Sequence, residues 1–551
     1  WGCSNRLIGQ ILLAGVHNTL GRVSAARGDE ERAVKHFETS ITTVTPDADA
    51  RLLAKARLAL QVEQLDLRGA TAGQQLLPGP RADAHATAIT AGPRATPSNL
   101  AVRRGPIHHL GDAWLEHFPA APPCGHQTLF TAGHCQYGVF ATGNQTLRVL
   151  RRRLASDQIE ICELPDPRPT GHGRGALALA IDRAGHLLLA YGASGAPVVY
   201  RRSIATESIT DWSEPLELTA ETLAAGPFPS FILPHPAQPG RPLMAWYAEG
   251  PPERRTARIK AYDETAERWI GAPAAILSNI APDRGPCGLE WSHVAVDRDG
   301  ALHLAFVFDL GDAGRRPTAS GLLVGYAMST DGGRTWQTST RQRCRLPIQA
   351  EQADIVQTLP PGRRPLGPPG VTVDNRNRPH ISVCTETRDG VREHHHIWVD
   401  GHVWRRRLAP PFDDSPPRAP DAAPRAPMAR PEVLIDRYDT VFVIDNEPLE
   451  QGLLTAVALP GPAYQVALAT LHLIDVAAPP LYALAIDHAR WTMDGTLSML
   501  IGCTLPSGVQ PAVDNGPSQV LVADMWLPPI APEPHPSVTA ATPGAAMHSD
   551  G

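Results

Sequence analysis

The stretch STDGGRTW, from Ser329 to Trp336, has the composition of a tight turn between two β-strands. Gly332 and Gly333 can adopt the positive φ angles that such a turn requires, because glycine has no Cβ atom. The side-chain oxygens of Ser329 and Asp331 can accept backbone N–H groups within the turn, and Trp336 can fold back into an apolar layer. The stretch therefore predicts a strand–turn–strand unit and says little about chemistry.

A second pattern recurs along the chain: an apolar strand, a turn that contains aspartate, and a second apolar strand. The copies are ALAIDRAGHLLLAYG (178–192), VAVDRDGALHLAFVF (294–308), VTVDNRNRPHISVCTE (371–386) and the weaker VLIDRYDTVFVID (433–445). In the second copy two faces alternate, with Leu302, Leu304, Phe306 and Phe308 on one and Ala301, His303, Ala305 and Val307 on the other. A sheet stacked between two neighbouring sheets requires such alternation. The spacing of the copies suits the blades of a β-propeller, which hold about four strands each.

Segments outside these repeats differ in composition. Apolar residues near the N-terminus recur with a period of about 3.6, which predicts helices. Gly21, Ala33, Phe37 and Pro46 there resemble a tetratricopeptide repeat. We therefore expect a helical tetratricopeptide-like segment at 1–70, an Ala/Pro/Gly-rich linker at 71–112, a β-propeller at 113–527 with a proline-rich insertion at 410–431, and a disordered tail at 528–551.

The composition excludes several classes of protein. The 551 residues carry a formal net charge of −6, which argues against a nucleic-acid-binding protein. Eight cysteines without a C-x-x-C pair indicate buried free thiols rather than a zinc ribbon. The apolar stretch from Leu7 to Val16 is too short to cross a bilayer, so we expect no membrane span. We predict no cofactor. The chain begins at Trp1, so a leader peptide can be neither seen nor excluded and the compartment stays unknown.

Four longer segments together resemble the BNR-repeat family of sialidase-like propellers, in which a turn such as STDGGRTW is called an Asp-box. They are GHQTLFTAGHCQYGVFATGNQTLRVLRRRL (125–154), APVVYRRS (196–203), LVGYAMSTDGGRTW (323–336) and HHHIWVDGHVWRRRL (394–408). The resemblance covers about residues 113–510. It implies a seven-bladed propeller that acts on uronic-acid polysaccharides, because the family contains ulvan lyases and a rhamnosidase that cleaves rhamnose from glucuronic acid. It also favours an extracytoplasmic location.

The positions that resemble the lyase site depart from the family pattern. Arg174-Gly175 stand where the lyases have His-Asn, Gly192-Ala193-Ser194 where they have Asp-His-His, and Ser230 where they have arginine. A lyase needs a base beside the uronate carboxylate and groups that stabilise the resulting charge. These departures weaken the lyase interpretation.

His126, followed by Gln127, resembles the first-blade His-Gln of the rhamnosidase-like branch, where histidine does the catalytic proton work with the substrate's uronic acid. The ordinary pKa of histidine, about 6.5, suits that work. A first-strand histidine hydrogen-bonded at a blade edge is the alternative. The remaining predicted site residues are expected to bind substrate: Gln127, Tyr137, Arg152, Tyr247, Trp291 and His293. Arg152 can pair bidentately with a uronate carboxylate, and Trp291 can stack on a sugar or fill a gap between blades.

The run His394-His395-His396 offers no complete metal site, because consecutive strand residues point to opposite faces and at most His394 and His396 can share an ion. We assign no metal. We expect a glycoside hydrolase or polysaccharide lyase that acts on acidic glycans. The alternative is a non-catalytic propeller that binds glycan or protein, with the N-terminal helices as a surface for a protein partner. A true sialidase ranks last, because the expected Arg-Ile-Pro near the first blade is absent.

Overall fold

The computed structural model describes 17 stretches of the chain, and all further statements concern these residues. They are 101–113, 128–142, 146–164, 176–192, 198–218, 230–250, 254–271, 274–281, 285–310, 321–387, 390–409, 432–445, 453–462, 464, 469–475, 481–504 and 518–530. The predicted helical segment at 1–70 and the proline-rich insertion at 410–431 lie outside them.

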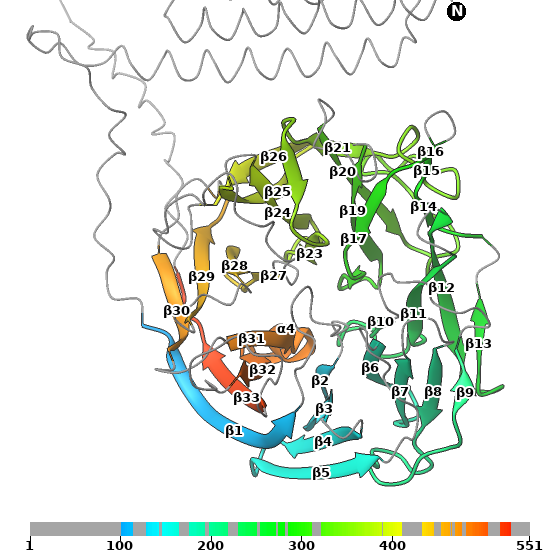
Figure 1. Cartoon of the computed structure of the whole chain (residues 1–551), viewed down its shortest axis with the longest axis vertical. Coiled ribbons are helices and arrows are strands. Elements are labelled where there is room, and N and C mark those ends of the chain that lie inside the picture. The colour runs from blue at the N-terminus through cyan, green and yellow to red at the C-terminus, as the bar shows by residue number, and fades with distance from the viewer. Residues whose placement is uncertain are drawn as a thin grey trace, which may run out of the picture. The chain divides into compact units, whose positions relative to one another are not determined.

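Seven antiparallel sheets of four or five strands form a ring, and each sheet runs from the centre of the ring to its rim (Figure 1). Blade 1 holds β2 (Leu129–Ala132), β3 (Cys135–Ala141), β4 (Leu147–Arg153) and β5 (Gln158–Leu164). Blade 2 holds β6 (Ala176–Ile181), β7 (Leu187–Gly192), β8 (Val199–Arg202) and β9 (Leu216–Glu217). Blade 3 holds β10 (Ser230–Ile232), β11 (Met244–Glu249), β12 (Thr256–Asp263), β13 (Arg268–Gly271) and β14 (Leu277–Ser278). The short pair β15 (Ile280–Ala281) and β16 (Gly285–Pro286) follows it.

The other blades repeat this order. Blade 4 holds β17 (Gly288–Trp291), β18 (Ala295–Val296), β19 (Leu302–Asp309), β20 (Leu322–Ser329) and β21 (Ile355–Thr358). Blade 5 holds β22 (Arg363–Pro365), β23 (Gly370–Val373), β24 (Pro379–Thr387), β25 (Arg392–Asp400) and β26 (Val403–Leu408). Blade 6 holds β27 (Glu432–Ile435), β28 (Thr440–Asp445), β29 (Leu453–Pro460) and β30 (Ala469–Asp475). Blade 7 holds β31 (Leu481–Ile486), helix α4 (His488–Asp494), β32 (Leu497–Thr504), β33 (Ser518–Trp526) and β1 (Arg103–Ala113). The predicted seven-bladed propeller is therefore confirmed.

The ring is closed by the strand that comes first in the sequence. β1 pairs antiparallel with β33, and Ile107 lies opposite Ala523 and Asp112 opposite Gln519. Blade 7 thus takes three strands from the end of the propeller and its outermost strand from the beginning (Figure 1). The predicted linker at 71–112 was wrong in its last part, because residues 103–112 belong to this strand.

The tail boundary also moves. Ile530 is buried in the core of blades 6 and 7, and its carbonyl accepts a hydrogen bond from Oγ1 of Thr440 at 3.4 Å. Residues 528–530 therefore belong to the propeller, contrary to the predicted tail at 528–551.

The core lies between neighbouring blades, as the alternation in β19 predicts. The large residues in and next to β19 face blade 3 and pack beside Trp246. The small ones face blade 5 and pack beside Ile381. The first set comprises Leu302, Leu304, Phe306 and Phe308, and the second includes Ala301, Ala305 and Val307. Phe306 lies opposite Gly325 of β20, where a Cβ atom would overlap the phenyl ring. This glycine makes room for the aromatic layer.

The Asp-box forms the predicted turn at the end of β20, where Met328 pairs with Gln337 in an isolated antiparallel bridge. Oγ of Ser329 accepts the backbone N–H of Gly333 at 2.9 Å, and Oδ1 of Asp331 accepts that of Thr335 at 2.9 Å. Gly332 and Gly333 have φ angles of 73° and 84°. The indole of Trp336 is fully buried in the core between blades 3 and 4. The motif therefore serves as a structural staple.

Aspartates begin the turn between the first and second strands in five blades. Each accepts one or two backbone N–H groups of its own turn or helix. They are Asp182, Asp297, Asp374, Asp436 and Asp487. In blade 7 the helix α4 takes the place of the tight turn. This repeated turn is the structural basis of the pattern in the sequence.

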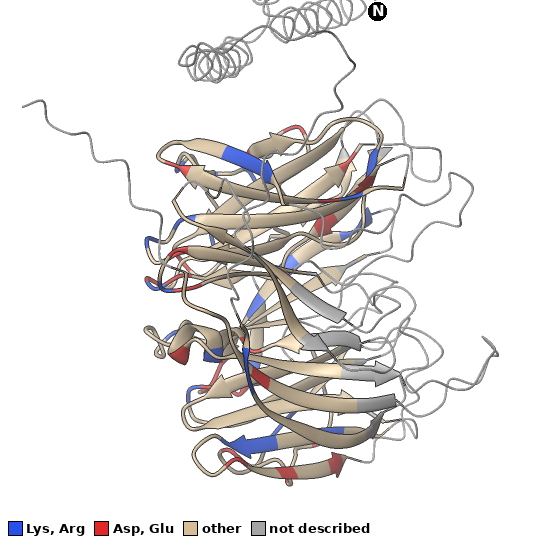
Figure 2. Ribbon diagram, turned by 90° about the vertical axis from the view of Figure 1, so that its left-hand side faces the viewer, with Lys and Arg blue, Asp and Glu red and all other residues tan. Residues whose placement is uncertain are grey.

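Charge is spread over the propeller without separation by sign. In the edge-on view, basic and acidic residues are interspersed among the described strands and turns (Figure 2). Five cysteines within the described stretches are free thiols, of which Cys384 is buried and the other four are half-buried. The prediction of buried free thiols is confirmed for Cys384, whereas the other four are free but not fully buried. No helix among the described residues is long and apolar enough to span a bilayer.

Candidate functional site

A pocket of about 460 Å³ lies at the centre of the ring, where the first strands of blades 3 to 7 end. Its walls come from five blades because the turns that follow these strands converge there. In four blades the residue directly after the turn aspartate lines the pocket: Arg298, Asn375, Arg437 and His488. The same repeat that builds the blades thus delivers one side chain from each of these four blades to a common centre.

Helix α4 is fixed to blade 1 through Asp487, whose side chain is fully buried. Its carboxylate accepts the N–H of Thr131 at 3.0 Å, the hydroxyl of Thr131 at 2.6 Å and Nε2 of Gln136 at 2.8 Å. It also caps the helix by accepting the N–H of Arg490 at 2.9 Å. Burial raises the pKa of Asp487, and these hydrogen bonds offset the effect only in part. The backbone at the start of α4 is therefore held in place.

Two histidines lie side by side in the pocket wall. The rings of His293, which follows β17, and His488 of α4 have centroids 5.3 Å apart and planes inclined by 38°. Nε2 of His488 lies 3.4 Å from Oε2 of Glu432, the first residue of β27. Glu432 is buried, whereas the side chain of His488 is 30% exposed. The arrangement presents an imidazole to the pocket with a carboxylate behind it.

The exposed charges of the pocket are largely basic. Arg298 and Arg437 are exposed, and Nη2 of Arg298 donates to the side-chain oxygen of Asn375 at 3.0 Å. The guanidinium of Arg437 lies over the ring of Tyr438 at 4.9 Å from its centroid. Burial, and then the charge of Arg298, lower the pKa of His235, another lining residue. An anion entering the pocket would therefore meet two guanidinium groups.

The carboxylates that line the pocket are largely engaged within the protein. Oδ1 of Asp436 accepts two backbone N–H groups, both at 2.8 Å, and burial raises the pKa of this carboxyl group. Asp494 accepts the N–H of Thr496 at 2.8 Å. Asp374 is paired with Arg378, as described below. They oppose a bound anion less than free carboxylates would.

Of the predicted site residues, His293 lines this pocket. His126 and Gln127 lie outside the described residues, so their roles stay predictions. Tyr137 has no exposed surface and stacks on Phe130 in the core between blades 1 and 2, which keeps its ring away from any ligand in this conformation.

Arg152 joins blade 1 to blade 7 and does not line the pocket. Its guanidinium is 3% exposed and lies 2.8 Å from the buried carboxylate of Asp524 on β33. It also lies 2.6 Å from Asp157, and Nη1 donates to Oε1 of Gln136 at 3.3 Å. Burial would raise the pKa of Asp524, but the hydrogen bond from Arg152 helps to hold it below its usual range. A substrate carboxylate would have to compete with both acidic partners of Arg152.

Tyr247 and Trp291 are also buried. The ring of Tyr247 on β11 is 5% exposed, and Nζ of Lys260 lies 5.1 Å from its centroid. Trp291, at the end of β17, packs edge-to-face on Trp246 with centroids 6.2 Å apart, and the guanidinium of Arg255 covers its ring at 4.8 Å. Trp291 therefore fills the gap between blades 3 and 4, which is the alternative that the sequence left open.

The histidines of β25 are all buried and have separate partners. Nε2 of His396 lies 2.9 Å from Nδ1 of His380, and Nε2 of His394 lies 3.7 Å from Sγ of Cys384. His395 points to the other face, where Nε2 lies 3.1 Å from Oγ1 of Thr385. The alternation along the strand is as expected, and His394 and His396 contact different side chains.

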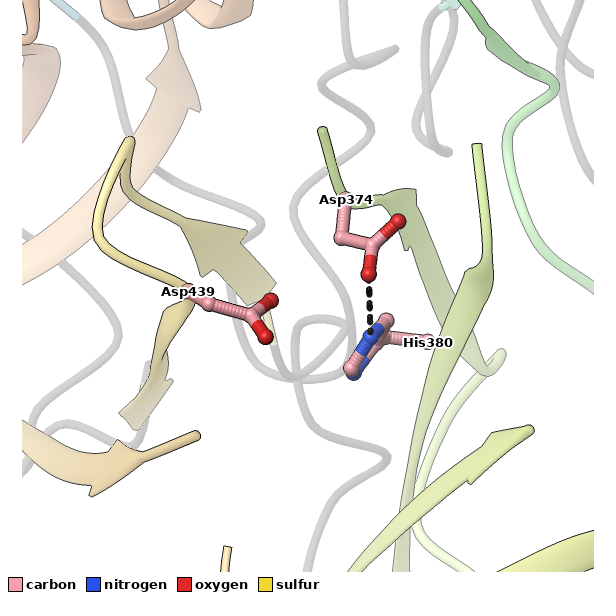
Figure 3. A group of neighbouring side chains, drawn as sticks. All are labelled: Asp374, His380 and Asp439. Carbon is pink, nitrogen blue, oxygen red and sulfur yellow. Dashed lines mark ion pairs between the residues drawn. The ribbon is translucent and has the colours of Figure 1, made fainter. Parts of the chain in front are cut away.

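One group among the described residues is compact enough for a metal ion: Asp374, His380 and Asp439, with ligand atoms within 4.8 Å of one another (Figure 3). Arg378 already joins its carboxylates, because Nη2 lies 2.6 Å from Asp374 and 3.3 Å from Asp439. Burial would raise the pKa of Asp374, but the imidazole of His380, 3.9 Å away, and hydrogen bonds from Arg378 hold it well below its usual range. The guanidinium supplies the positive charge that an ion would supply, so these residues fit an ion poorly.

The equivalent residues of blade 4 support this structural interpretation. Asp297 begins the corresponding turn, and its Oδ2 lies 3.1 Å from Nε2 of His303. Nδ1 of His303 lies 2.7 Å from the hydroxyl of Tyr326. An aspartate and a histidine six positions later thus face each other in both blades, and in blade 4 they fasten the turn to the second strand, whereas in blade 5 they lie 3.9 Å apart.

The sequence interpretation missed His488, Glu432, Arg298 and Arg437. A usable signal was present, because three of them directly follow a turn aspartate and such positions share one end of the ring. Aligning the repeats on these aspartates would have selected His488 in LAIDHARWTMDG. Glu432 had no comparable signal, since it precedes the apolar strand β27 and meets His488 only in the folded ring.

The ring of four- and five-stranded blades and the Asp-box define a propeller of the BNR class. The model of the BNR repeat-containing family matches residues 135–410, half of the chain, and the protein belongs to this family. No curated protein sequence matches the chain.

Similar solved structures share the fold at low sequence identity. Polysaccharide lyase Uly1 has 14% identity and a TM-score of 0.53, over 73% of this chain and 90% of that chain. An ulvan lyase of family PL25 has 12% identity and a TM-score of 0.52, over 77% and 96%. The same lyase family bound to -[GlcA(1-4)Rha3S]- gives 11% identity and a TM-score of 0.50 over the same shares. At such identities the likeness establishes the fold alone.

Proposed function

We propose that the protein is a carbohydrate-active β-propeller that acts on polysaccharide containing uronic acid, and that it cleaves a glycosidic bond of the rhamnose–glucuronate type. The proposal depends on the pocket at the centre of the ring, called the axial pocket below. Two exposed arginines and a pair of histidines from different blades line it. The family and the fold of the ulvan lyases support it as analogy.

A uronate ring offers features that match the pocket. Its carboxylate can pair with Arg298 or Arg437, since a guanidinium binds a carboxylate through two parallel N–H bonds. The exposed ring of Tyr438 gives an aromatic surface for the apolar face of a sugar. A pocket of about 460 Å³ lies within the range of small-ligand sites, roughly 300–1,000 Å³, and can take one or two sugar rings.

Cleavage of a glycosidic bond requires a proton at the leaving oxygen, and histidine can supply one near neutral pH. The pocket provides His293 and His488 for this task. His126 stays a second proposed proton donor, on its resemblance to the rhamnosidase-like branch. Gln127 beside it would then bind the same sugar.

The test is to incubate the full chain, and separately a His126→Ala variant, with rhamnosyl-glucuronate oligosaccharides and with ulvan. New reducing ends report hydrolysis, and absorbance from unsaturated uronates reports lyase activity. We expect new reducing ends without the absorbance change. Unsaturated products would instead assign lyase chemistry, and normal turnover by the variant would remove His126 from the site while leaving the enzyme.

One observation favours the alternative of a non-catalytic propeller that binds glycan or protein. Ser230, which stands at the position of the lyase arginine, is 7% exposed on β10 and cannot take over the function of a guanidinium. Binding of a glucuronate oligosaccharide by calorimetry, together with no turnover of either substrate, would establish this alternative. The predicted N-terminal helices would then be the first place to seek a protein partner.

A further inference from the structure

Glu432 of blade 6 and His488 of blade 7 are in contact, and of the two only His488 lines the pocket. Glu432 is 5% exposed at the start of β27, and its Oε2 lies 3.4 Å from Nε2 of His488. Removing a carboxylate from water is costly unless a charged or hydrogen-bonded group compensates it. The imidazole of His488 is one of the groups that face this carboxylate.

The position of His488 is set independently of its side chain. Its preceding residue, Asp487, is held by Thr131 and Gln136 of blade 1, and Trp491 donates through Nε1 to the carbonyl of Ile435 at 2.7 Å. The helix is thus tied to blades 1 and 6. A residue that transfers a proton has to be held within a few tenths of an ångström of its working position, and rigid support of this kind provides such placement.

The surroundings of His488 suit work on an anionic sugar. His293 lies beside it, with ring centroids 5.3 Å apart, and Arg298 and Arg437 reach the same pocket from blades 4 and 6. The arginines can hold the uronate carboxylate. Because Nε2 of His488 is buried against Glu432, Nδ1 is the ring nitrogen left to face the glycosidic oxygen. A histidine and two arginines therefore line one pocket, and a buried carboxylate lies 3.4 Å from that histidine without a hydrogen bond between them.

We infer that His488 is the residue that donates the proton to the leaving oxygen in the axial pocket, and that Glu432 is its positioning residue. This inference rests on the proposed glycoside cleavage. Protonated His488 gives its proton to the glycosidic oxygen, which departs with the electron pair of the broken C–O bond. The oxocarbenium ion takes the oxygen of a water molecule, and that water returns one proton to His488. One water is added across the bond, and the imidazole regains its proton.

The experiment compares the wild-type chain with His488→Ala, His488→Gln, Glu432→Gln and a matched control, His402→Ala. His402 is exposed in the turn between β25 and β26 and does not line the pocket. Reducing-end release from a rhamnosyl-glucuronate oligosaccharide gives kcat and KM, calorimetry gives the affinity for a glucuronate oligosaccharide, and thermal melts check folding.

We expect kcat to fall about 100-fold or more in both His488 variants, with KM changed less than about 3-fold, and free imidazole to restore part of the activity of His488→Ala. Glu432→Gln should lose about 10-fold in kcat, and Glu432→Asp should recover part of this loss. His402→Ala should match the wild type.

Three results have separate meanings. Wild-type turnover together with normal kcat in folded His488→Ala or His488→Gln overturns the assignment and leaves the proposed function intact. A loss in Glu432→Gln that lies in KM or in thermal stability, with kcat unchanged, rejects Glu432 as a positioning residue. Absence of turnover in the wild type overturns the proposed function and the assignment with it, whatever the binding affinity.

Discussion

Replacing Arg152 with alanine removes a buried ion pair between the first and last blades. The guanidinium and the carboxylate of Asp524 are 3% and 2% exposed and lie 2.8 Å apart. Breaking such a pair typically costs about 3–5 kcal/mol, because one charge stays buried without its partner. Asp524 keeps a hydrogen bond from Ser498 at 2.6 Å and one from Arg490 at 3.0 Å. We therefore expect a loss near the lower end, ~3 kcal/mol.

This loss translates into a measurable change of melting temperature. An unfolding entropy of ~2.1 cal/mol/K per residue gives ~0.8 kcal/mol/K for roughly 400 residues, so ~3 kcal/mol lowers Tm by about 4 °C. Urea denaturation followed by tryptophan fluorescence gives the free energy of unfolding. Arg153→Ala is the matched control, because Arg153 is the next residue on β4, is 53% exposed and lies 3.5 Å from Glu160. The control should lose about 1 kcal/mol or less.

The pH dependence supplies an independent check. The folded-state pKa of Asp524 lies below its ordinary value, so its contribution is present above the unfolded pKa, about 3.9, and is lost as pH falls through the folded pKa. The stability gap between the wild type and Arg152→Ala should therefore shrink below about pH 4. An unchanged free energy of unfolding at neutral pH, combined with a raised KM for a uronate substrate, would refute the structural role and restore Arg152 as a substrate ligand.

Three further perturbations test the fold and the site. Gly325→Ala should lower the free energy of unfolding by about 1–3 kcal/mol, because the new Cβ atom would overlap Phe306. Gly240→Ala is the control and should melt at the temperature of the wild type, because the space around its Cβ position is open. Equal melting temperatures of the two variants would contradict the tight packing. Asp331→Ala should lower the free energy of unfolding by about 1–3 kcal/mol through lost turn hydrogen bonds and leave KM unchanged, because the Asp-box does not line the pocket; a change in KM with unaltered stability would reverse this assignment. Added Zn²⁺ or Ca²⁺ should not raise the Tm of the wild type, because Arg378 already pairs with the carboxylates of Asp374 and Asp439. In Arg378→Ala the added ion should raise the Tm. Differential scanning fluorimetry with and without a chelator measures both effects, and a rise in the wild type would contradict the role of Arg378.

Much of the propeller could be predicted because its signals are local. Each repeat carries an aspartate turn between two apolar strands, and the alternation in β19 correctly assigns which side chains face each neighbouring blade. The strand β1 was not predicted from the sequence, because RRGPIHHLGDA contains glycine and proline and has little apolar periodicity. It lies at the outer edge of blade 7. An edge strand is defined by its partner, and that partner lies about 400 residues away along the chain.

The site was predicted less well because its members are brought together only by the ring. Strand alternation correctly implies that one arginine of the run 151–153 points inward, but it cannot reveal that this arginine pairs with Asp524 of blade 7. Trp291 has an aromatic side chain of the kind that stacks on sugars, but it is a core residue here because Trp246 of the preceding blade packs against it. His488 could have been found from the repeat register, and Glu432 could not.

The closure of blade 7 by β1 gives the order of synthesis a physical consequence. On the ribosome the outermost strand of this blade emerges first, and its partner β33 emerges last. Until then β1 is an unpaired edge, which is a template for wrong pairing, and contacts so distant in sequence form slowly. A chain that stops before Ser518 would lack the partner of β1 altogether. Nascent propeller should therefore remain vulnerable to proteases and dependent on chaperones until its final strand leaves the ribosome.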